Sequence, residues 1–458
     1  MAEDGGISEE EIPNRPTRMT FRPLAGAKHT LRTLRYRNYR LFFGGQGISL
    51  IGTWMQRIAM SWLAYRLTNS VFLLGIVGFL GQIPTFVLSP LAGVLADRWN
   101  RRQVLVITQI LSMVQALVLA VLVLTGTVQI WHVMVLAVFL GLINALDVPA
   151  RQAFVVEMIE KREDLVNAIA LNSALFNGAR LLGPSIAGVL IAAVGEGWCF
   201  LLNGLSYIAV IAALVAMRIL PRKADGNRGN MLHGIREGFA YAIGLAPIRS
   251  VLLLLSLISL VGMPYTILMP VFARDILGGG PHTLGFLMGA MGLGALVGAL
   301  YLASRRSVLG VERNIPVAAA VFGIGLIGVS LSRVLAVSLV LMMVTGFGMM
   351  VQMASSNTLL QTIVDDDKRG RVMSLYAMAF MGVAPFGSLL GGAVADKIGA
   401  PHTLLAGGVC CIFGAALLAR QLPVFHEAVR RATEKTGFIG DAGIRVEAAT
   451  ELVKPPPG

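Results

Sequence analysis

Long apolar runs, separated by short polar breaks, recur along the whole 458-residue chain. A bilayer core of about 30 Å is crossed by roughly 20 residues of helix, and the runs are of this length or longer. The pattern therefore predicts an all-α membrane protein with twelve transmembrane helices. We place these at residues 41–64, 71–96, 103–125, 131–151, 165–194, 197–218, 250–273, 283–303, 314–332, 336–363, 371–395 and 401–420.

The longest internal polar break, residues 219–249, divides the chain into two halves of similar size. We expect the following segments: a cytoplasmic N-terminal segment at 1–35, a six-helix half at 36–220, a cytoplasmic central loop at 221–247, a second six-helix half at 248–421 and a cytoplasmic tail at 422–458. Within the loop, residues 229–247 have the pattern of a short amphipathic helix on the membrane surface, with Met231, Ile235, Phe239 and Ile243 on one side. The tail is expected to be frayed from about residue 426.

Lysine and arginine are unevenly distributed between alternate breaks. If the N-terminus is cytoplasmic, the loops on that side hold most of the basic residues, among them Arg98, Arg101, Arg102, Arg305 and Arg306, and the opposite loops hold few. Cytoplasmic loops are the ones enriched in these residues. Both termini are therefore predicted to be cytoplasmic, and the polar, Arg-rich first 40 residues do not resemble a cleavable signal peptide.

Composition and charge narrow the class of protein. Only 14% of residues are charged, against about 25% in soluble proteins. The net charge of +13 could suit nucleic acid, but the basic residues lie in the breaks between apolar runs, so no nucleic-acid partner is expected. Cys199, Cys410 and Cys411 fall in apolar runs without metal-binding spacing. Neither an ATP-binding loop nor an H-E-x-x-H sequence occurs, so we expect no enzyme, cofactor or metal.

The two halves resemble each other in sequence. Leu74-Gly75 and Leu284-Gly285 each begin a Gly-rich run that ends in a charged pair, Asp97-Arg98 and Arg305-Arg306. Gly141 has an apparent counterpart in Gly348, and both precede a charged break. Repeated halves around a site at the middle of the membrane are common in transporters.

The break after the second run has the most specific sequence, residues 93–102 (GVLADRWNRR) followed by Leu105. It resembles the signature loop G-x-L-A-D-R-x-G-R-R-x-x-L of the major facilitator superfamily. Asn100 replaces the usual glycine, and asparagine tolerates a left-handed turn better than most residues. The resemblance implies a fold of twelve helices in two pseudo-symmetric halves. It also implies a gating role for the loop residues Gly93, Asp97, Arg98, Arg101 and Arg102.

Residues 178–188 in the fifth run resemble a second superfamily pattern, the G-x-x-x-G-P-x-x-G-G sequence of its antiporters. The matching residues are Gly178, Gly183, Pro184 and Gly188, with Ala187 in place of one glycine and one extra residue upstream. The resemblance favours an exporter over an importer.

Residues 147–154 (DVPARQAF), with the segments 37–42, 62–68 and 234–238, resemble the bacterial transmembrane secretion effectors, which include exporters similar to the enterobactin exporter. One departure is important. Many proton-coupled facilitators carry an arginine four residues before a glycine of the fourth helix, whereas Ala137 stands before Gly141 here. Proton antiport through that arginine is therefore not expected.

Polar residues recur at helical spacing within four runs, and polar groups inside a membrane mark transport pathways. We predict a substrate cavity lined by Gln46, Thr53, Arg57, Asn144, Asn177, Arg180, Gln352 and Ser356. The alternative is that these groups only bond between helices. Asp147 and Arg151 are expected near the cytoplasmic end as a gating pair with the signature loop, and Asp147 is the leading candidate if a carboxylate carries protons.

Three functions are compatible with these features. The first is proton-coupled efflux of a siderophore-like or drug-like molecule by a monomer in the bacterial inner membrane. The second is a facilitator that imports a metabolite or translocates a lysolipid. The third is a membrane sensor with the same fold but no transport.

Overall fold

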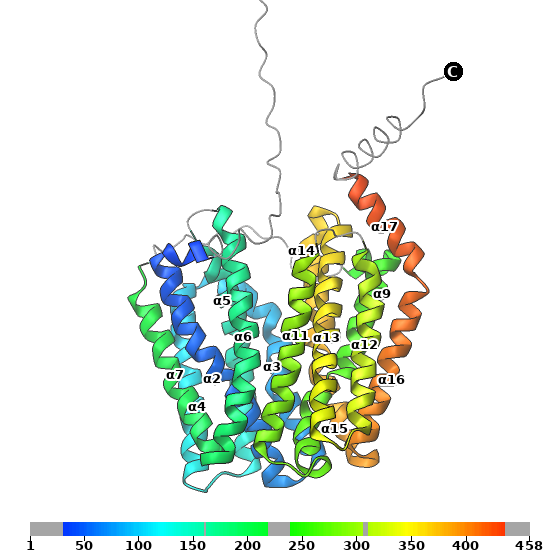
Figure 1. The fold of residues 1–458 in the computed structure, drawn as a ribbon. Coiled ribbons are helices and arrows are strands. Elements are labelled where there is room, and N and C mark those ends of the chain that lie inside the picture. Colours follow the sequence, from blue (N-terminus) through cyan, green and yellow to red (C-terminus); the bar gives the residue numbers. More distant parts are fainter. Residues whose placement is uncertain (1–30, 160–161, 219–238, 306–309, 436–458) are drawn as a thin grey trace, which may run out of the picture.

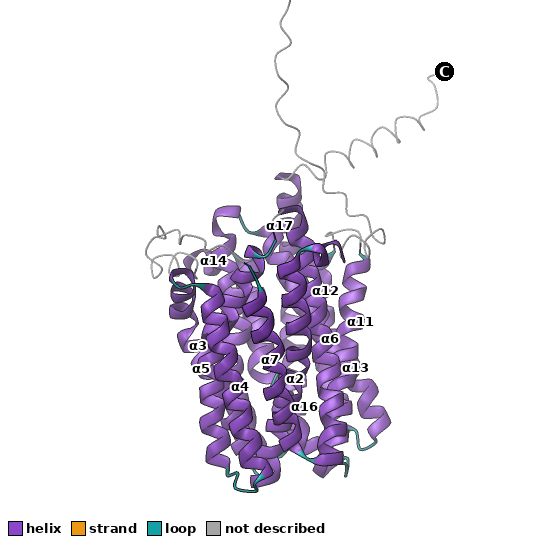
Figure 2. Cartoon of the chain, turned by 90° about the vertical axis from the view of Figure 1, so that its left-hand side faces the viewer, coloured by secondary structure: helices purple, strands orange, loops and turns teal. Residues whose placement is uncertain are grey.

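The computed structural model describes residues 31–159, 162–218, 239–305 and 310–435, and within these ranges it is built from helices without strands (Figure 1). The helices run nearly parallel in one bundle (Figure 2). The first part of the chain contributes α2 (Arg37–Thr68), α3 (Val71–Arg98), α4 (Arg101–Leu124), α5 (Ile130–Glu157), α6 (Arg162–Val194) and α7 (Glu196–Ala216), preceded by the short η1 (Leu31–Arg35).

The second part of the chain contains two interrupted helices among continuous ones. The first is α9 (Ala246–Leu257), η2 (Ile258–Gly262), α10 (Tyr265–Val271) and η3 (Phe272–Ile276), and the second is α14 (Asp366–Ala377), η4 (Met378–Gly382) and α15 (Ala384–Ile398). The segments η2, η3 and η4 are π-helical, and such segments are frequent at functional sites. The continuous helices are α11 (Pro281–Ser304), α12 (Val311–Leu331), α13 (Leu335–Ile363), α16 (Ala400–Ala419) and α17 (Leu422–Lys435).

These helices agree with the twelve predicted runs to within six residues at each end, and the largest difference is at the end of α5. Eleven spans among the described residues are long and apolar enough to cross a membrane. The remaining predicted span, α2, has 32 residues but is less apolar than the others. The all-helical membrane fold is confirmed, whereas the count of twelve crossings stays a prediction.

η1 and α17 lie at the same end of the bundle, the upper end in Figure 1, which we call the proximal end. The opposite, distal end carries the turns that follow α2, α4, α6, η3 and α15. Residues with positive φ occur in each of these turns, and at the first of them Asn69 (φ 50°) caps α2 in the left-handed conformation.

Helices of the first and second parts meet mainly through two pairs, α3 with α15 and α6 with α11. The second predicted run thus packs on the eleventh, and the fifth packs on the eighth. A twofold relation between two six-helix halves makes the second run equivalent to the eighth and the fifth equivalent to the eleventh, so it relates these two contacts to each other. The two parts lie side by side in Figure 1, blue to green beside yellow-green to red.

The glycines show where the predicted repeat holds. A Cβ on Gly75 would stand 2.9 Å from the Cα of Gly392, and a Cβ on Gly285 would stand 2.7 Å from the Cα of Gly188, so Gly75 and Gly285 are equivalent as expected. The predicted equivalence of Gly141 and Gly348 is wrong. Gly141 packs on α3 at Gly81, whereas Gly348 packs on α12; the glycine of α13 that faces α11 is Gly346. An offset of two residues turns a helix by about 200°, which is why the faces differ.

The tail differs from the sequence expectation as well. Residues 422–435 form α17 rather than a frayed end, because Phe425 and Val429 are one turn apart and are both buried against the bundle. The His426 imidazole also lies 3.1 Å from the buried Glu312 carboxylate of α12. Most of the predicted amphipathic helix at 229–247 lies outside the described residues; residues 239–244 are helical, with Phe239 and Ile243 exposed.

Candidate transport pathway

Two arginines and a tryptophan form a cluster inside the bundle. The Arg57 guanidinium lies 4.8 Å from the centre of the Trp54 ring, and that of Arg180 lies 5.8 Å from the same ring. Arg57 is about three helical turns from the distal end of α2, and Arg180 is about four turns from that of α6. Both charges are therefore at membrane depth, as the predicted cavity requires.

The exposed side chain of Arg57 faces the interior of the bundle rather than lipid. Arg180 of α6, Arg151 of α5 and Tyr207 of α7 all interact electrostatically with residues of this cluster. Arg57 is thus surrounded by three neighbouring helices although it is exposed. The exposure of Arg57 among these helices indicates that other side chains do not fully enclose it.

The cluster continues into the second part of the chain. A terminal nitrogen of Arg180 lies 3.7 Å from Sδ of Met349 on α13, and the guanidinium also interacts with Tyr265 on α10. The Tyr265 hydroxyl donates to Sδ of Met291 on α11. Residues from both parts of the chain therefore meet around Arg180. Two of them, Trp54 and Tyr265, were not among the predicted cavity residues.

A second polar cluster surrounds the buried Asp147. One carboxylate oxygen accepts hydrogen bonds from Thr108 Oγ1 (2.8 Å) and Gln109 Nε2 (2.7 Å), and the other accepts from Arg151 one turn later. Arg151 also donates to Gln46 Oε1 at 3.3 Å. The predicted Asp147–Arg151 pair is present, but among the described residues its other hydrogen bonds go to α2 and α4 at Gln46, Thr108 and Gln109 rather than to the signature loop.

A third polar group was missed by the sequence analysis. Asn203 of α7 donates to Gln56 of α2 at 2.6 Å, and Gln56 donates to Gln115 of α4 at 2.8 Å; all three side chains are buried. Buried amides in a membrane protein are stable when they bond to one another. The sequence shows these three amides within apolar runs, but they do not lie at the helical spacing that linked the predicted cavity residues.

The other predicted cavity residues have local or interhelical partners. Thr53 and Asn177 bond to backbone carbonyls one turn earlier in their own helices. Gln352 donates to Ser356 at 3.2 Å within α13, and its buried Oε1 has no hydrogen-bond partner in the described part of the chain. Asn144 is half-buried. The predicted cavity residues therefore belong to separate clusters. Gln46 lies with Asp147, whereas Arg57 lies with Arg180.

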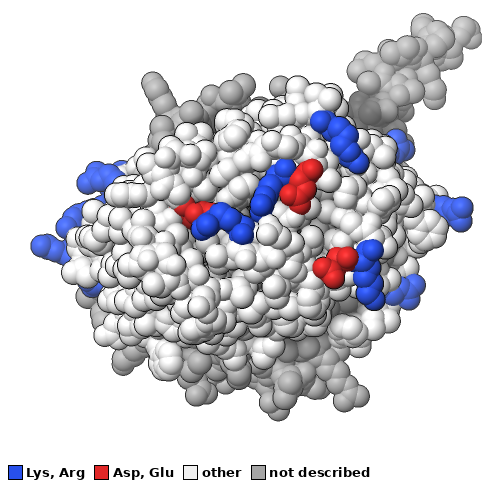
Figure 3. Space-filling view, turned by 90° about the horizontal axis from the view of Figure 1, so that it is seen from below, with Lys and Arg blue, Asp and Glu red and all other residues white. Residues whose placement is uncertain are grey.

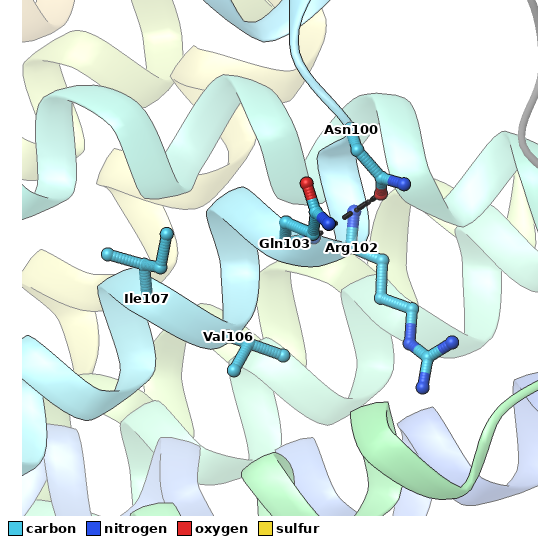
Figure 4. Close-up of a pocket in the computed structure, with 5 residues that line it drawn as sticks. All are labelled: Asn100, Arg102, Gln103, Val106 and Ile107. Atoms are coloured by element: carbon cyan, nitrogen blue, oxygen red, sulfur yellow. Dashed lines mark hydrogen bonds between the residues drawn. The ribbon is translucent and has the colours of Figure 1, made fainter.

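The signature loop is ordered around Asn100 (Figure 4). Asn100 has extended backbone rather than the left-handed conformation considered for it. It is the N-cap of α4, where its side chain accepts hydrogen bonds from the backbone N–H groups of Arg102 and Gln103. These residues line a surface pocket of about 480 Å³ that continues along α4 to Ile107.

The two described arginines of this loop bind different groups. Arg101 forms a 2.6 Å ion pair with Glu157 at the end of α5. Arg102 instead donates to the carbonyls of Leu214 and Val215, both at 2.7 Å, where a cation stabilises the C-terminal end of α7. Gly93, Asp97 and Arg98 lie in α3, and their side chains are outside the described part of the structure.

The glycines of the antiporter-like sequence do not all have the same surroundings. A Cβ on Gly183 would stand 2.5 Å from Cβ of Trp54, and Gly188 packs on Gly285, so both permit close helix packing. Pro184 lies between them, and its carbonyl oxygen would stand 2.6 Å from a Cβ on Gly285. Gly178 differs from them, because among the described residues no atom outside its own helix backbone lies within 4 Å of its Cβ position.

A polar contact joins the two parts of the chain at the distal end. The Tyr65 hydroxyl of α2 donates to the Asp275 carboxylate of η3, and Arg274 donates to Asn69 Oδ1 at 2.7 Å. The Arg274 guanidinium also lies 5.8 Å from the Tyr65 ring centre. Seen from this end, acidic and basic side chains lie next to each other near the middle of the molecule (Figure 3). We call Tyr65, Asn69, Arg274 and Asp275 the distal latch.

These features have counterparts in known proteins. Residues 28–438 match the family described as transmembrane secretion effectors. The chain belongs to this family. It is a multi-pass membrane transporter of the major facilitator superfamily, and the family and its relatives are transporters rather than enzymes.

Several bacterial transport proteins are similar to this one over most of the chain. The Staphyloferrin A transporter of Staphylococcus aureus is 28% identical over 378 residues, 81% of this chain and 93% of that protein. Macrolide efflux protein A of Streptococcus pyogenes is 25% identical over 395 residues, 82% of this chain and 95% of that protein. Multidrug efflux pump Tap of Mycolicibacterium fortuitum is 27% identical over 371 residues, 79% of this chain and 88% of that protein.

Solved structures support the same fold. A bacterial homologue of the human lysosomal transporter Spinster, in an inward-facing and unoccupied conformation, superposes with a TM-score of 0.65 at 14% identity, over 87% of this chain and 98% of that one. A POT family transporter gives 0.67 at 10% identity, over 86% and 99%. At these identities the likeness concerns the fold alone.

Proposed function

We propose that this protein exports a small molecule across the bacterial inner membrane by alternating access and in exchange for protons. In this proposal it acts as a monomer with both termini in the cytoplasm, so that the distal end faces outward. The observation that carries the proposal is the contact of Arg180 with Met349 beside Arg57 and Trp54. Charged and aromatic groups from both parts of the chain meet there at membrane depth, where a substrate could be exposed to either side in turn.

Export, rather than import, is supported by the helix-five sequence and by the two relatives whose names specify efflux. The Staphyloferrin A transporter supports a siderophore-like substrate, and the efflux proteins support a drug-like one. The outward direction also fits the structure if the distal latch is the outer gate. The protein would then bind its substrate from the cytoplasm in the conformation described here.

Asp147 is the proposed proton-exchange residue. As a carboxylate it accepts three hydrogen bonds, from Thr108, Gln109 and Arg151. Protonation would remove the charge that holds Arg151. A conformational change that moves Arg151 away would, reciprocally, favour protonation of Asp147. Because Arg151 also interacts electrostatically with Arg57, this change would reach the substrate cluster.

Everted membrane vesicles test this function. Vesicles containing the protein would be energised and their internal acidity followed with a fluorescent dye while candidate siderophores and drugs are added. We expect a substrate to dissipate the pH gradient only when the protein is present, and Asp147→Asn to abolish this response. Asp396→Asn, at an exposed acid near the distal end of α15, is the matched control and should respond like the unmodified protein.

The two other functions give different results in the same vesicles. If no compound moves protons but a labelled metabolite or lysolipid crosses the membrane, the protein is a facilitator or lipid translocator. If no compound crosses and a ligand still binds, a sensor role replaces transport.

A further inference from the structure

Two positive charges in the middle of the bundle have no acidic partner among the described residues. The guanidinium of Arg57 contacts the Trp54 ring, and that of Arg180 contacts the same ring and the Met349 sulfur. The acid of this region, Asp147, is already bonded to Arg151, Thr108 and Gln109. The Arg57–Arg180 cluster therefore carries two uncompensated charges.

Such charges are unfavourable at membrane depth. A guanidinium confined at membrane depth is less well hydrated than one in bulk water, and the two guanidiniums also repel each other. Contact with an aromatic face offsets only a small part of this cost. The surroundings therefore favour the binding of a counter-ion that the described protein does not supply.

We propose that Arg57 and Arg180 bind an anionic substrate, a small molecule that carries at least two carboxylate or phosphate groups. The inference rests on the transport role proposed above for this cluster. A guanidinium presents a planar pair of donors that matches either anion, and each arginine can bind one acidic group in this way. Two arginines on different helices, α2 and α6, thus select a substrate with two separated charges.

The rest of the site indicates the body of this substrate. The Trp54 ring lies beside both guanidiniums, Met349 and Tyr265 contact Arg180, and Met291 accepts a hydrogen bond from Tyr265. Methionine and aromatic side chains adapt to apolar surfaces of varied shape. An organic polyanion fits these groups better than an inorganic ion, and a cationic drug would be repelled by the arginines.

The charge of the substrate also bears on the direction of transport. The membrane potential of a bacterial cell is negative inside, and it acts on every charge that crosses. An anion is therefore driven outward by the potential even without a proton gradient. A polyanionic substrate is consistent with export.

Equilibrium binding to the purified full chain tests the inference. The probe is benzene-1,3,5-tricarboxylate, followed by quenching of tryptophan fluorescence, with pyrophosphate as the phosphate probe and tetraphenylphosphonium as the cationic probe. We expect at least one anion to bind, its quenching to be lost in Trp54→Phe, and Arg57→Gln or Arg180→Gln to weaken its binding by about tenfold or more. Arg333→Gln, an exposed arginine at the distal end, should bind as the unmodified protein does.

Each result has a distinct meaning. Binding of the tricarboxylate alone assigns carboxylates, and binding of pyrophosphate alone assigns phosphates. The proposal is overturned if the phosphonium binds and neither anion does, or if both glutamine variants bind the anion at full strength. Arg57→Lys separates charge loss from misfolding, because it should keep part of the affinity.

The binding result is independent of the export test. If the anion binds but no vesicle experiment links transport to protons, the anion site stands and proton-coupled export fails. If protons are exchanged for a cationic or neutral compound, and Arg57→Gln/Arg180→Gln does so at the same rate, export stands and the anion site fails.

Discussion

Gly188 of α6 lies directly against Gly285 of α11, so that a Cβ on Gly188 would stand 2.7 Å from the Cα of Gly285. The equivalent contact of Gly75 with Gly392 joins α3 to α15. Both contacts lie within two helical turns of the distal end. The two parts of the chain are therefore closely packed at this end through a symmetric pair of glycine contacts.

A large side chain at this contact should disfavour the packed conformation. We expect Gly285→Leu to cost that state about 1–3 kcal/mol, as overpacking does, which is about a 5- to 150-fold shift between conformations. Transport in vesicles should fall accordingly while the protein still elutes as a single species. Gly44→Leu is the matched control, because no described atom outside its own helix backbone lies within 4 Å of its Cβ position. Normal transport by Gly285→Leu would show that the packed state is not part of the cycle.

The distal latch should have to open during transport. In a background without Cys199, Cys410 and Cys411, we would replace Asn69 and Arg274 with cysteine, since their side chains are 2.7 Å apart. A short cross-linker that forms a disulfide with each of the two cysteines should then stop transport. Reduction of these disulfides should restore transport. Each single-cysteine variant serves as the control. Undiminished transport by the cross-linked protein would refute the latch as a gate.

Asp147 and Arg151 should be strongly coupled in stability. Removing one member of a buried ion pair leaves a charge without its partner and costs about 3–5 kcal/mol. We therefore expect Asp147→Asn and Arg151→Gln each to lower the thermal midpoint in detergent. The double variant should recover part of the loss, without recovering proton-linked transport. If the two effects simply add, the pair does not act as a unit.

The proposed orientation is testable with single cysteines. Thr127 is exposed in a distal turn, and Arg305 is exposed at the proximal end. We expect a membrane-impermeant maleimide to label Thr127→Cys in intact spheroplasts, and to label Arg305→Cys only after permeabilisation. The reverse pattern would place the termini outside and would invert the direction of the proposed transport.

The positions of most helices, the Gly75–Gly285 repeat and the resemblance to the superfamily could all be read from the sequence alone. In a bilayer each span must satisfy its own backbone hydrogen bonds, so an apolar run of sufficient length has one stable structure whatever its neighbours are. The signature loop at 93–102 and the repeated Gly75 and Gly285 could also be recognised, because each is a feature of the local sequence. The Asp147–Arg151 pair was also predictable, since one helical turn separates the two residues.

Which polar groups meet depends on how the helices pack in three dimensions. Arg57 and Gln46 share one helical stripe, yet Gln46 bonds to Arg151, whereas Arg57 lies with Trp54 and Arg180. The Gln56–Asn203 bond and the Tyr65–Asp275 bond join residues about 150 and 210 positions apart. Such contacts depend on how closely helices approach and at what angle they cross. Small residues on both helices set that approach jointly, so no single run contains the information.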